Sequence, residues 1–432
     1  MPPLPLSGSR VVLVDGCRTP FLRSQTDFAD IPAYQLGAMA IAGLLHKTRL
    51  DPTAIDRLIM GTVIAEPRTS NLAREVALAV GLPQSLPAHT VTAACTSSNV
   101  AIASAAEAIA AGTAEVVIAG GAETLSDVPI RFSRAIRKRL IASQKARGPA
   151  DYLKLLSGLG LRDLAPDMPA IAEFSTGQTM GESAERLAKR VGVSREDQDA
   201  FALSSHRRAA AAAERGYLAA QMAPALVPPR FTPLRFDNGI RGDSSPEKLA
   251  SLPPVFDRRF GTVSAGNASF LTDGAAVVLL MSEAKAQELG YEPLAVIDGL
   301  AMAATDPREE LLMGPAYAIP KALDASGITL EQVGVFELHE AFAAQMLANL
   351  RLLSDKNFAR EKLGRDREVG EIPPDKLNAW GGSLSIGHPF GATGARLLLT
   401  AAQRMKQENA EWGLISACAA GALGHAMTLR RV

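Results

Sequence analysis

Short apolar runs alternate with long alanine-rich stretches along this chain. The apolar runs predict β-strands, most clearly at residues 10–15, 57–63, 115–119, 261–267, 275–281 and 413–416. The alanine-rich stretches, such as residues 194–216, have the composition of helices. Alternation of this kind is typical of an α/β fold in which helices cover both faces of a sheet.

A weak repeat relates the two halves of the chain. Four segments recur in the same order: 11–16 as 294–299, 55–63 as 333–341, Cys95 with its helix as His388 with its helix, and 115–121 as 412–418. The order indicates a duplication. Between the halves lies a segment of different character, with proline-rich turns. We therefore predict an N-terminal half of residues 1–127 completed by 251–283, an inserted loop domain of residues 128–250, and a C-terminal half of residues 284–432.

Composition narrows the class of protein. A chain of 432 residues with 45 basic and 45 acidic side chains and 5% aromatic residues does not have the profile of a nucleic-acid binder. Three cysteines are too few for a disulfide framework or a four-thiolate metal site. The start shows no leader pattern, and no uncharged apolar run reaches membrane-spanning length. We expect a cytoplasmic protein with no integral membrane association.

Cys95 is the first candidate for chemistry. It follows a β-like run and precedes a helix of small residues. Unpaired N–H groups at the start of a helix favour the thiolate, which is the reactive form of cysteine. A nucleophile is one interpretation of Cys95. The other is a buried structural cysteine, the commoner state of a lone cysteine in alanine-rich sequence.

A glycine-rich segment surrounds His388. Five glycines between residues 381 and 394, together with Pro389, predict a tight loop that enters a helix. A histidine held in such a loop polarises a carbonyl or exchanges protons near neutral pH. A phosphate-cradling loop or simple turn chemistry explains the pattern equally well.

Two further groups stand at the ends of β-like runs. Cys418 opens a small-residue turn, which suits either a thiol acid/base beside backbone oxyanion donors or a buried thiol. His339 precedes Glu340, but a second histidine at zinc-binding spacing is missing, so we expect no metal and regard a helix cap as the plain alternative. If the halves are duplicates, Cys95 and His388 occupy equivalent turns, and all four side chains converge at strand ends.

Several motifs, spread over nearly the whole chain, resemble those of the thiolase family. They are Gly120-Gly-Ala-Glu-Thr-Leu-Ser, Met180-Gly-Glu-Ser-Ala-Glu, Gly261-Thr-Val-Ser-Ala-Gly-Asn-Ala-Ser and Gly387-His-Pro. His339-Glu-Ala-Phe and Cys418-Ala-Ala-Gly are similar to the β subunits of bacterial fatty-oxidation and trifunctional complexes. Ala422 departs from the pattern, which has glycine there. The resemblance implies a thiolase fold of two βαβαβαββ halves in a five-layered α-β-α-β-α core, with an inserted loop domain.

The resemblance also implies a role for each site residue. Cys95 would be the nucleophile that forms an acyl thioester, and His388 would activate it and donate to the thioester oxygen. Cys418 would move a proton to or from acetyl-CoA, and His339 would orient a water or donate directly in a first oxyanion site. The backbone N–H groups of Cys95 and Ala420 would form the second. The family's pantetheine contacts map to Met180, Ala265, Ser269 and Phe342.

The implied function is CoA-dependent thiolytic cleavage of 3-oxoacyl-CoA in fatty-acid β-oxidation. CoA is then a substrate, and we expect no permanently bound cofactor. Condensation of two acetyl-CoA units is the alternative with the same residues. A decarboxylating ketoacyl synthase fits less well because those enzymes typically use one cysteine with two histidines. A non-catalytic acyl-CoA-binding or lipid-binding relative fits less well because all the chemical groups are present.

The resemblance extends to partners. We expect a homodimer or homotetramer, with a multifunctional α subunit as a candidate partner. Residues 131–147 hold seven Lys or Arg side chains and no acid. This basic run suits a solvated helix face, the phosphates of CoA, an anionic membrane surface or a partner subunit.

Overall fold

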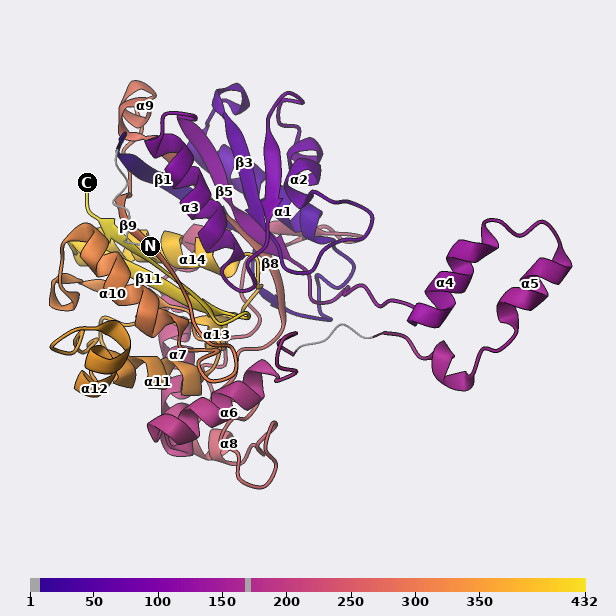
Figure 1. Ribbon diagram of the computed structural model, residues 1–432. Coiled ribbons are helices and arrows are strands. Elements are labelled where there is room, and N and C mark those ends of the chain that lie inside the picture. The colour runs from indigo at the N-terminus through magenta and orange to yellow at the C-terminus, as the bar shows by residue number, and fades with distance from the viewer. Residues whose placement is uncertain (1–7, 168–171) are drawn as a thin grey trace.

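A mixed β-sheet spans the two halves of the molecule (Figure 1), of which a computed structural model describes residues 8–167 and 172–432. The expectation of no leader concerns N-terminal residues that lie outside these ranges. The sheet has ten strands, and β2 (Leu22–Arg23) pairs with β8 (Thr272–Ser282). The other strands follow in the order β10 (Val335–Leu338), β11 (Trp412–Ala419), β12 (Leu423–Arg430), β9 (Ala295–Ala304), β1 (Val11–Arg18), β8, β5 (Val116–Glu123), β3 (Arg57–Gly61) and β4 (Ala88–Val91). Strands β1 and β9 join the two halves through antiparallel pairs between residues 11–13 and 295–297.

The N-terminal half has the predicted order of elements. Its members are β1 (Val11–Arg18), α1 (Ala33–Thr48), β3 (Arg57–Gly61), α2 (Leu72–Val80), β4 (Ala88–Val91), α3 (Ser97–Ala110), β5 (Val116–Glu123) and β8 (Thr272–Ser282). Strands β4, β3 and β5 pair in parallel, and β8 pairs antiparallel with β5 and β1. All eleven residues of β8 are buried, and the strand includes the apolar run predicted at residues 275–281.

The C-terminal half repeats this plan. Its members are β9 (Ala295–Ala304), α10 (Gly314–Ser326), β10 (Val335–Leu338), α11 (Ala343–Leu353), α14 (Thr393–Glu408), β11 (Trp412–Ala419) and β12 (Leu423–Arg430). Strands β10 and β11 are parallel, and β12 is antiparallel to β11 and β9. Leu377 forms a parallel bridge to Phe336 of β10, at the place that β4 takes in the first half. The predicted duplication is confirmed.

The buried side chains define five layers. Helices α1 and α2 pack on the outer face of the N-terminal half-sheet, and α10 and α11 pack on the outer face of the C-terminal one. Helices α3 and α14 lie between the two half-sheets, in one core with residues of both. Small residues permit this close central packing: a Cβ at Gly394 would lie 2.1 Å from Oδ1 of Asn99. The predicted α-β-α-β-α core is therefore confirmed.

The inserted segment joins β5 to β8. It contains α4 (Arg134–Ser143), α5 (Pro149–Leu156), α6 (Met180–Val191), α7 (Arg195–Glu214), β6 (Ala225–Val227), β7 (Thr232–Leu234) and α8 (Pro246–Ala250). Figure 1 shows α4 and α5 extending far from the body of the molecule. The basic run of residues 131–147 includes α4, which has no buried residue. The domain limits drawn from the sequence stay a prediction.

The strand predicted at residues 261–267 is wrong. This stretch is a loop with one isolated bridge, between Ser264 and Pro254, and side chains take the N–H groups of residues 262–264. The carboxylate of Glu185 in α6 accepts hydrogen bonds from the N–H groups of Thr262 and Val263 at 2.7–2.9 Å. Within the described ranges, no helix combines the length and apolar character needed to cross a bilayer.

Candidate active site

A strained turn places Cys95 between β4 and α3. Ala94 has φ +47°, a left-handed conformation that non-glycine residues rarely adopt and that collects at functional sites. The Ser97 hydroxyl accepts a hydrogen bond from the N–H of Ala93 and donates to the carbonyl of Ala94. The Thr96 hydroxyl donates to the carbonyl of Ala93. The turn therefore holds Cys95 directly ahead of the helix, as the sequence predicts.

Three of the predicted side chains meet at one point. The sulfur of Cys95 and one ring nitrogen each from His339 and His388 lie within 4.8 Å of one another. The centroids of the two imidazole rings are 4.0 Å apart. Both histidines are buried, whereas Cys95 keeps partial exposure. The duplicated halves thus deliver a thiol from one half and two imidazoles from the other.

Burial opposes the effect of the helix start on the Cys95 thiol. Burial raises the pKa of this thiol to about 12, and the negative charge of Glu123 adds to this rise. The N–H groups of Ala420 and of Cys95 itself reach the sulfur and lower the pKa by less. These are the two backbone donors assigned above to an oxyanion site, and the structure brings both to the nucleophile.

Cys418 completes the group. It lies in β11 opposite Gly424 of β12 and is buried. Burial raises the pKa of its thiol, and a charge on nearby Cys95 raises it further. The turn that follows contains Ala422 at φ +56°, a conformation in which glycine is favoured. The carbonyl of Ala422 accepts a hydrogen bond from the N–H of Thr305.

Each histidine is held by a hydroxyl group that sequence reasoning did not single out. Nδ1 of His388 lies 2.7 Å from the hydroxyl of Thr393, and Nδ1 of His339 lies 2.9 Å from that of Ser383 in α13 (Ser383–Ile386). Burial lowers the pKa of both rings, that of His339 to about 3. Both hydroxyls belong to the glycine-rich segment 381–394, so the only available signal was their place in that segment.

A buried carboxylate connects the two halves beside the site. Glu123, the last residue of β5, accepts hydrogen bonds from the Thr62 hydroxyl and from the N–H groups of Val63, Ile64 and Gly391. Burial outweighs these donors and raises the pKa of Glu123 to about 7. Glu123 thus fixes the loop after His388 against the loop after β3. Its place in the Gly-Gly-Ala-Glu motif marked it as notable but gave it no role.

The residues mapped to pantetheine are distributed around the same region. Met180 begins α6, and Met180 and Phe342 pack against the apolar cluster that contains Cys418. The N–H of Ser269 donates to the carbonyl of Ala341 at 2.9 Å. Ala265 is exposed, and the other three are partly exposed. All four are therefore accessible to a ligand.

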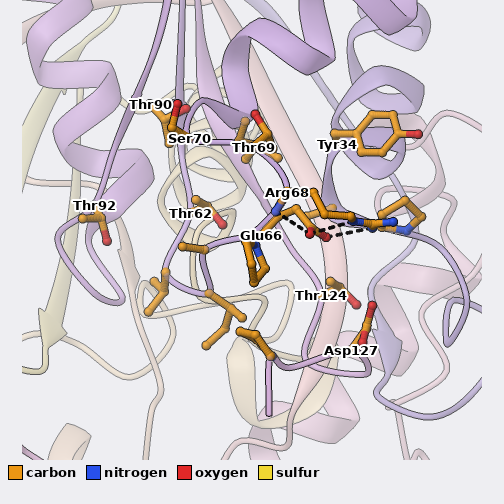
Figure 2. A pocket seen from close by; sticks show the side chains of 18 of the residues that line it. Tyr34, Thr62, Glu66, Arg68, Thr69, Ser70, Thr90, Thr92, Thr124 and Asp127 are labelled. Carbon is orange, nitrogen blue, oxygen red and sulfur yellow. Dashed lines mark hydrogen bonds and ion pairs between the residues drawn. The ribbon is translucent and has the colours of Figure 1, made fainter. Parts of the chain in front are cut away.

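A hollow of about 510 Å³ opens on the N-terminal half (Figure 2). Thr62, Glu66, Arg68, Thr92 and Asp127 are among the residues that line it, and Arg68 is paired with Glu66 at 2.8 Å. None of the two thiols and two histidines described above lines this hollow. It adjoins the site through Thr62, which bonds to Glu123, and through the segment that leads to Cys95.

Fold and site together define a class. Two thiols, two imidazoles and backbone N–H groups at the meeting point of duplicated α/β halves are suited to acyl transfer through an enzyme-bound thioester. The model of the thiolase N-terminal domain matches residues 11–284, and that of the C-terminal domain matches residues 291–431. The chain therefore belongs to the thiolase family.

Similar proteins span nearly the same length. The chain is 49% identical to the mitochondrial trifunctional enzyme subunit beta of Bos taurus, over 96% of this chain and 87% of that protein. It is 46% identical to a 3-ketoacyl-CoA thiolase of Yersinia enterocolitica, over 98% of each. The crystal structure of human mitochondrial 3-ketoacyl-CoA thiolase in complex with CoA aligns with TM-score 0.84 and 30% identity, covering 99% of both chains.

Proposed function

We propose that the protein is an acyltransferase that cleaves 3-oxoacyl-CoA with a second CoA, in fatty-acid β-oxidation. The products are acetyl-CoA and an acyl-CoA with two carbons fewer. One observation carries the proposal: Cys95, His339 and His388 present their reactive atoms within 4.8 Å of one another. The relatives named 3-ketoacyl-CoA thiolase and trifunctional enzyme subunit beta support thiolysis over condensation.

The first half-reaction forms the acyl enzyme. Cys95 gives its thiol proton to His388, and the sulfur attacks the 3-oxo carbon of the substrate. The N–H groups of Cys95 and Ala420 stabilise the resulting oxyanion. Its collapse reforms the carbonyl and breaks the C2–C3 bond, whose electron pair becomes the enolate of acetyl-CoA. The enolate oxygen accepts hydrogen bonds from His339 and His388, and the Cys418 thiol protonates C2.

The second half-reaction returns the enzyme to its starting state. The thiol of an incoming CoA gives its proton to the Cys418 thiolate, and the CoA sulfur attacks the thioester on Cys95. The tetrahedral oxyanion again lies against the N–H groups of Cys95 and Ala420. Cys95 leaves as a thiolate and takes its proton back from His388. CoA is thus a substrate, and no step needs a further cofactor.

Other expectations remain proposals. The exposed Ala265 and the partly exposed Met180, Ser269 and Phe342 are proposed to contact the pantetheine arm. Self-association as a dimer or tetramer, and assembly with a multifunctional α subunit, follow from the resemblance to the β subunits. Light scattering of the purified protein, alone and coexpressed with such a subunit, tests both. The cytoplasmic setting also stays a prediction, which fractionation of the source cells tests.

The test follows the loss of 3-oxoacyl-CoA enolate absorbance with acetoacetyl, medium-chain and long-chain substrates. Wild type is expected to cleave in a CoA-dependent way and to carry an acyl group on the Cys95 peptide. Cys95→Ser should abolish turnover because a hydroxyl replaces the thiol nucleophile. Cys17→Ala is the matched control, since Cys17 is buried in β1 within a separate core. Near-normal turnover of Cys95→Ser would exclude this nucleophile, and a folded wild type inactive at every chain length would favour an acyl-CoA-binding protein.

A further inference from the structure

We propose that Ser383, held by Arg396, is a positioning residue that fixes His339 as the neutral imidazole with its proton on Nε2. His339 is thereby a preformed hydrogen-bond donor beside Cys95 and His388. The inference rests on the proposed function only for the identity of the oxygen that receives this hydrogen bond. The placement of the proton follows from the contacts alone.

A buried chain of contacts leads from a carboxylate to His339. Glu337 of β10 lies 3.5 Å from Arg396 of α14, and both side chains are fully buried. Arg396 Nη2 donates to the hydroxyl oxygen of Ser383 at 3.2 Å. That oxygen lies 2.9 Å from Nδ1 of His339. The chain therefore ends at Nδ1 and leaves Nε2 as the ring nitrogen without a hydrogen-bond partner among the described residues.

The direction of each hydrogen bond follows from what each group can donate. A guanidinium has only donors, so Arg396 occupies a lone pair of the Ser383 oxygen. The Ser383 hydroxyl has one hydrogen, which needs an acceptor. In the part of the chain that the structure describes, its recorded partners are Arg396, which accepts nothing, and His339 Nδ1. The hydroxyl therefore donates to Nδ1, which must carry a lone pair.

The proton of His339 then lies on Nε2. Burial and the charge of Arg396 lower the pKa of His339 to about 3, which excludes a second proton on the ring near neutral pH. Nε2 is buried and has no hydrogen-bond partner among the described residues. A buried N–H without a partner is costly, and substrate oxygen in the site would satisfy it.

The neighbouring ring is held in the opposite state. The Thr393 hydroxyl donates to the carbonyl of Pro389 at 3.0 Å, so towards His388 Nδ1, at 2.7 Å, it can only accept. His388 then carries its proton on Nδ1 and presents a lone pair at Nε2, as a base for the Cys95 thiol requires. One imidazole is therefore a hydrogen-bond donor and its neighbour is a base, because different hydroxyl contacts place their protons on different nitrogens.

The direct test uses long-range ¹H–¹⁵N correlation spectra of protein with ¹⁵N-labelled histidine, since the chain has only six histidines. His339→Asn and His388→Asn variants assign the two rings. We expect His339 to show a protonated Nε2 and a bare Nδ1, and His388 to show the reverse. The same tautomer on both rings, or a doubly protonated His339 at neutral pH, would overturn the proposal. The spectrum needs no turnover, so its outcome is independent of the proposed reaction.

A variant then tests the positioning role. Ser383→Ala should let His339 sample both tautomers, and kcat should fall by at least about tenfold, against about 10²–10³ for outright loss of an oxyanion donor. KM should change by less than about threefold, because the hydroxyl touches no substrate. Ser385→Ala is the matched control: it removes a buried hydroxyl from the same short helix, one that bonds to Ser205 and to the Gly382 carbonyl.

Ser383→Thr keeps the hydroxyl and should retain the wild-type tautomer of His339. Equal losses of kcat in Ser383→Ala and Ser385→Ala, with the His339 signals unchanged in both, would show a purely structural role for Ser383. If the tautomers are as proposed but no 3-oxoacyl-CoA is cleaved, the proposed function fails and the hydroxyl-directed tautomer stands. If 3-oxoacyl-CoA is cleaved but His339 has its proton on Nδ1, the proposed function stands and the hydroxyl-directed tautomer fails.

Discussion

Glu337→Gln should destabilise the protein strongly, because it leaves a buried guanidinium without a counter-ion. Glu337 lies between Arg396 and Arg404, with contacts of 3.5 and 2.9 Å, and all three side chains are fully buried. Arg404 keeps Glu408 and the carbonyls of Phe336 and Lys376 after the change. Among the described residues, the Ser383 hydroxyl is the one hydrogen-bond acceptor that Arg396 keeps. The uncompensated charge is therefore that of Arg396.

The expected magnitude follows from this difference. Breaking a buried ion pair by removing one partner costs about 3–5 kcal/mol. Unfolding entropy of about 2.1 cal/mol/K per residue gives roughly 0.9 kcal/mol/K for a chain of 432 residues. Glu337→Gln should thus lower Tm by about 3–6 °C. Calorimetry at one fixed protein concentration measures it, because self-association would make Tm depend on concentration.

Glu408→Gln is the matched control. Glu408 pairs with the same Arg404, but its side chain is 35% exposed, so water compensates for the loss. Exposed pairs contribute about 0–1 kcal/mol, so its Tm should fall by no more than about 1 °C. Adding Arg396→Met to Glu337→Gln should recover part of the loss by removing the stranded charge. Equal Tm shifts for Glu337→Gln and Glu408→Gln, or no recovery in the double variant, would refute the reasoning.

Two further results are expected of the thiols. Cys418→Ala should slow deuterium exchange at the methyl group of acetyl-CoA far more than it slows acylation of Cys95. The reason is that Cys418 is the proposed acid/base. Equal effects on the two rates would show that Cys418 has a structural role. Burial raises the pKa of Cys95 to about 12, so its thiolate fraction increases throughout the neutral range. Alkylation of the Cys95 peptide by iodoacetamide should therefore rise about tenfold per pH unit from about pH 6 to about pH 9, and a plateau near neutral pH would contradict this environment.

The strands and the duplication could be predicted because they depend on short-range pattern, whereas the five layers were implied by the resemblance to thiolases. Strands β1, β3, β5, β8 and β11 coincide with apolar runs, and their repetition in order predicted the duplication. The error at residues 261–267 has a tertiary cause. These residues have strand composition, but the carboxylate of Glu185, from a distant helix, takes the N–H groups that a strand partner would need. Nothing local in the sequence indicates such a contact.

The site could be predicted as a set of residues but not as a set of protonation states. Spacing and duplication brought Cys95 and His388 to equivalent turns, and the structure places them together. The contacts that orient the rings come from Ser383, Thr393 and Arg396, which only the folded chain brings to the histidines. A buried acid in β10, two residues before His339, is the one local sign, since an isolated charge in a buried strand needs a partner.

One physical cause, burial, keeps all the reacting groups neutral before substrate binds. It raises the pKa of Cys95 and Cys418 and lowers that of His339 and His388. Proton transfer from Cys95 to His388 would separate charge in a dry site, which is unfavourable in the free enzyme. It becomes favourable when the sulfur bonds to carbon and the new charge moves to an oxygen beside the N–H groups of Cys95 and Ala420. The helix start near Cys95 thus does little to ionise the thiol in the free enzyme. Its main effect is to stabilise the negative charge that forms during the reaction.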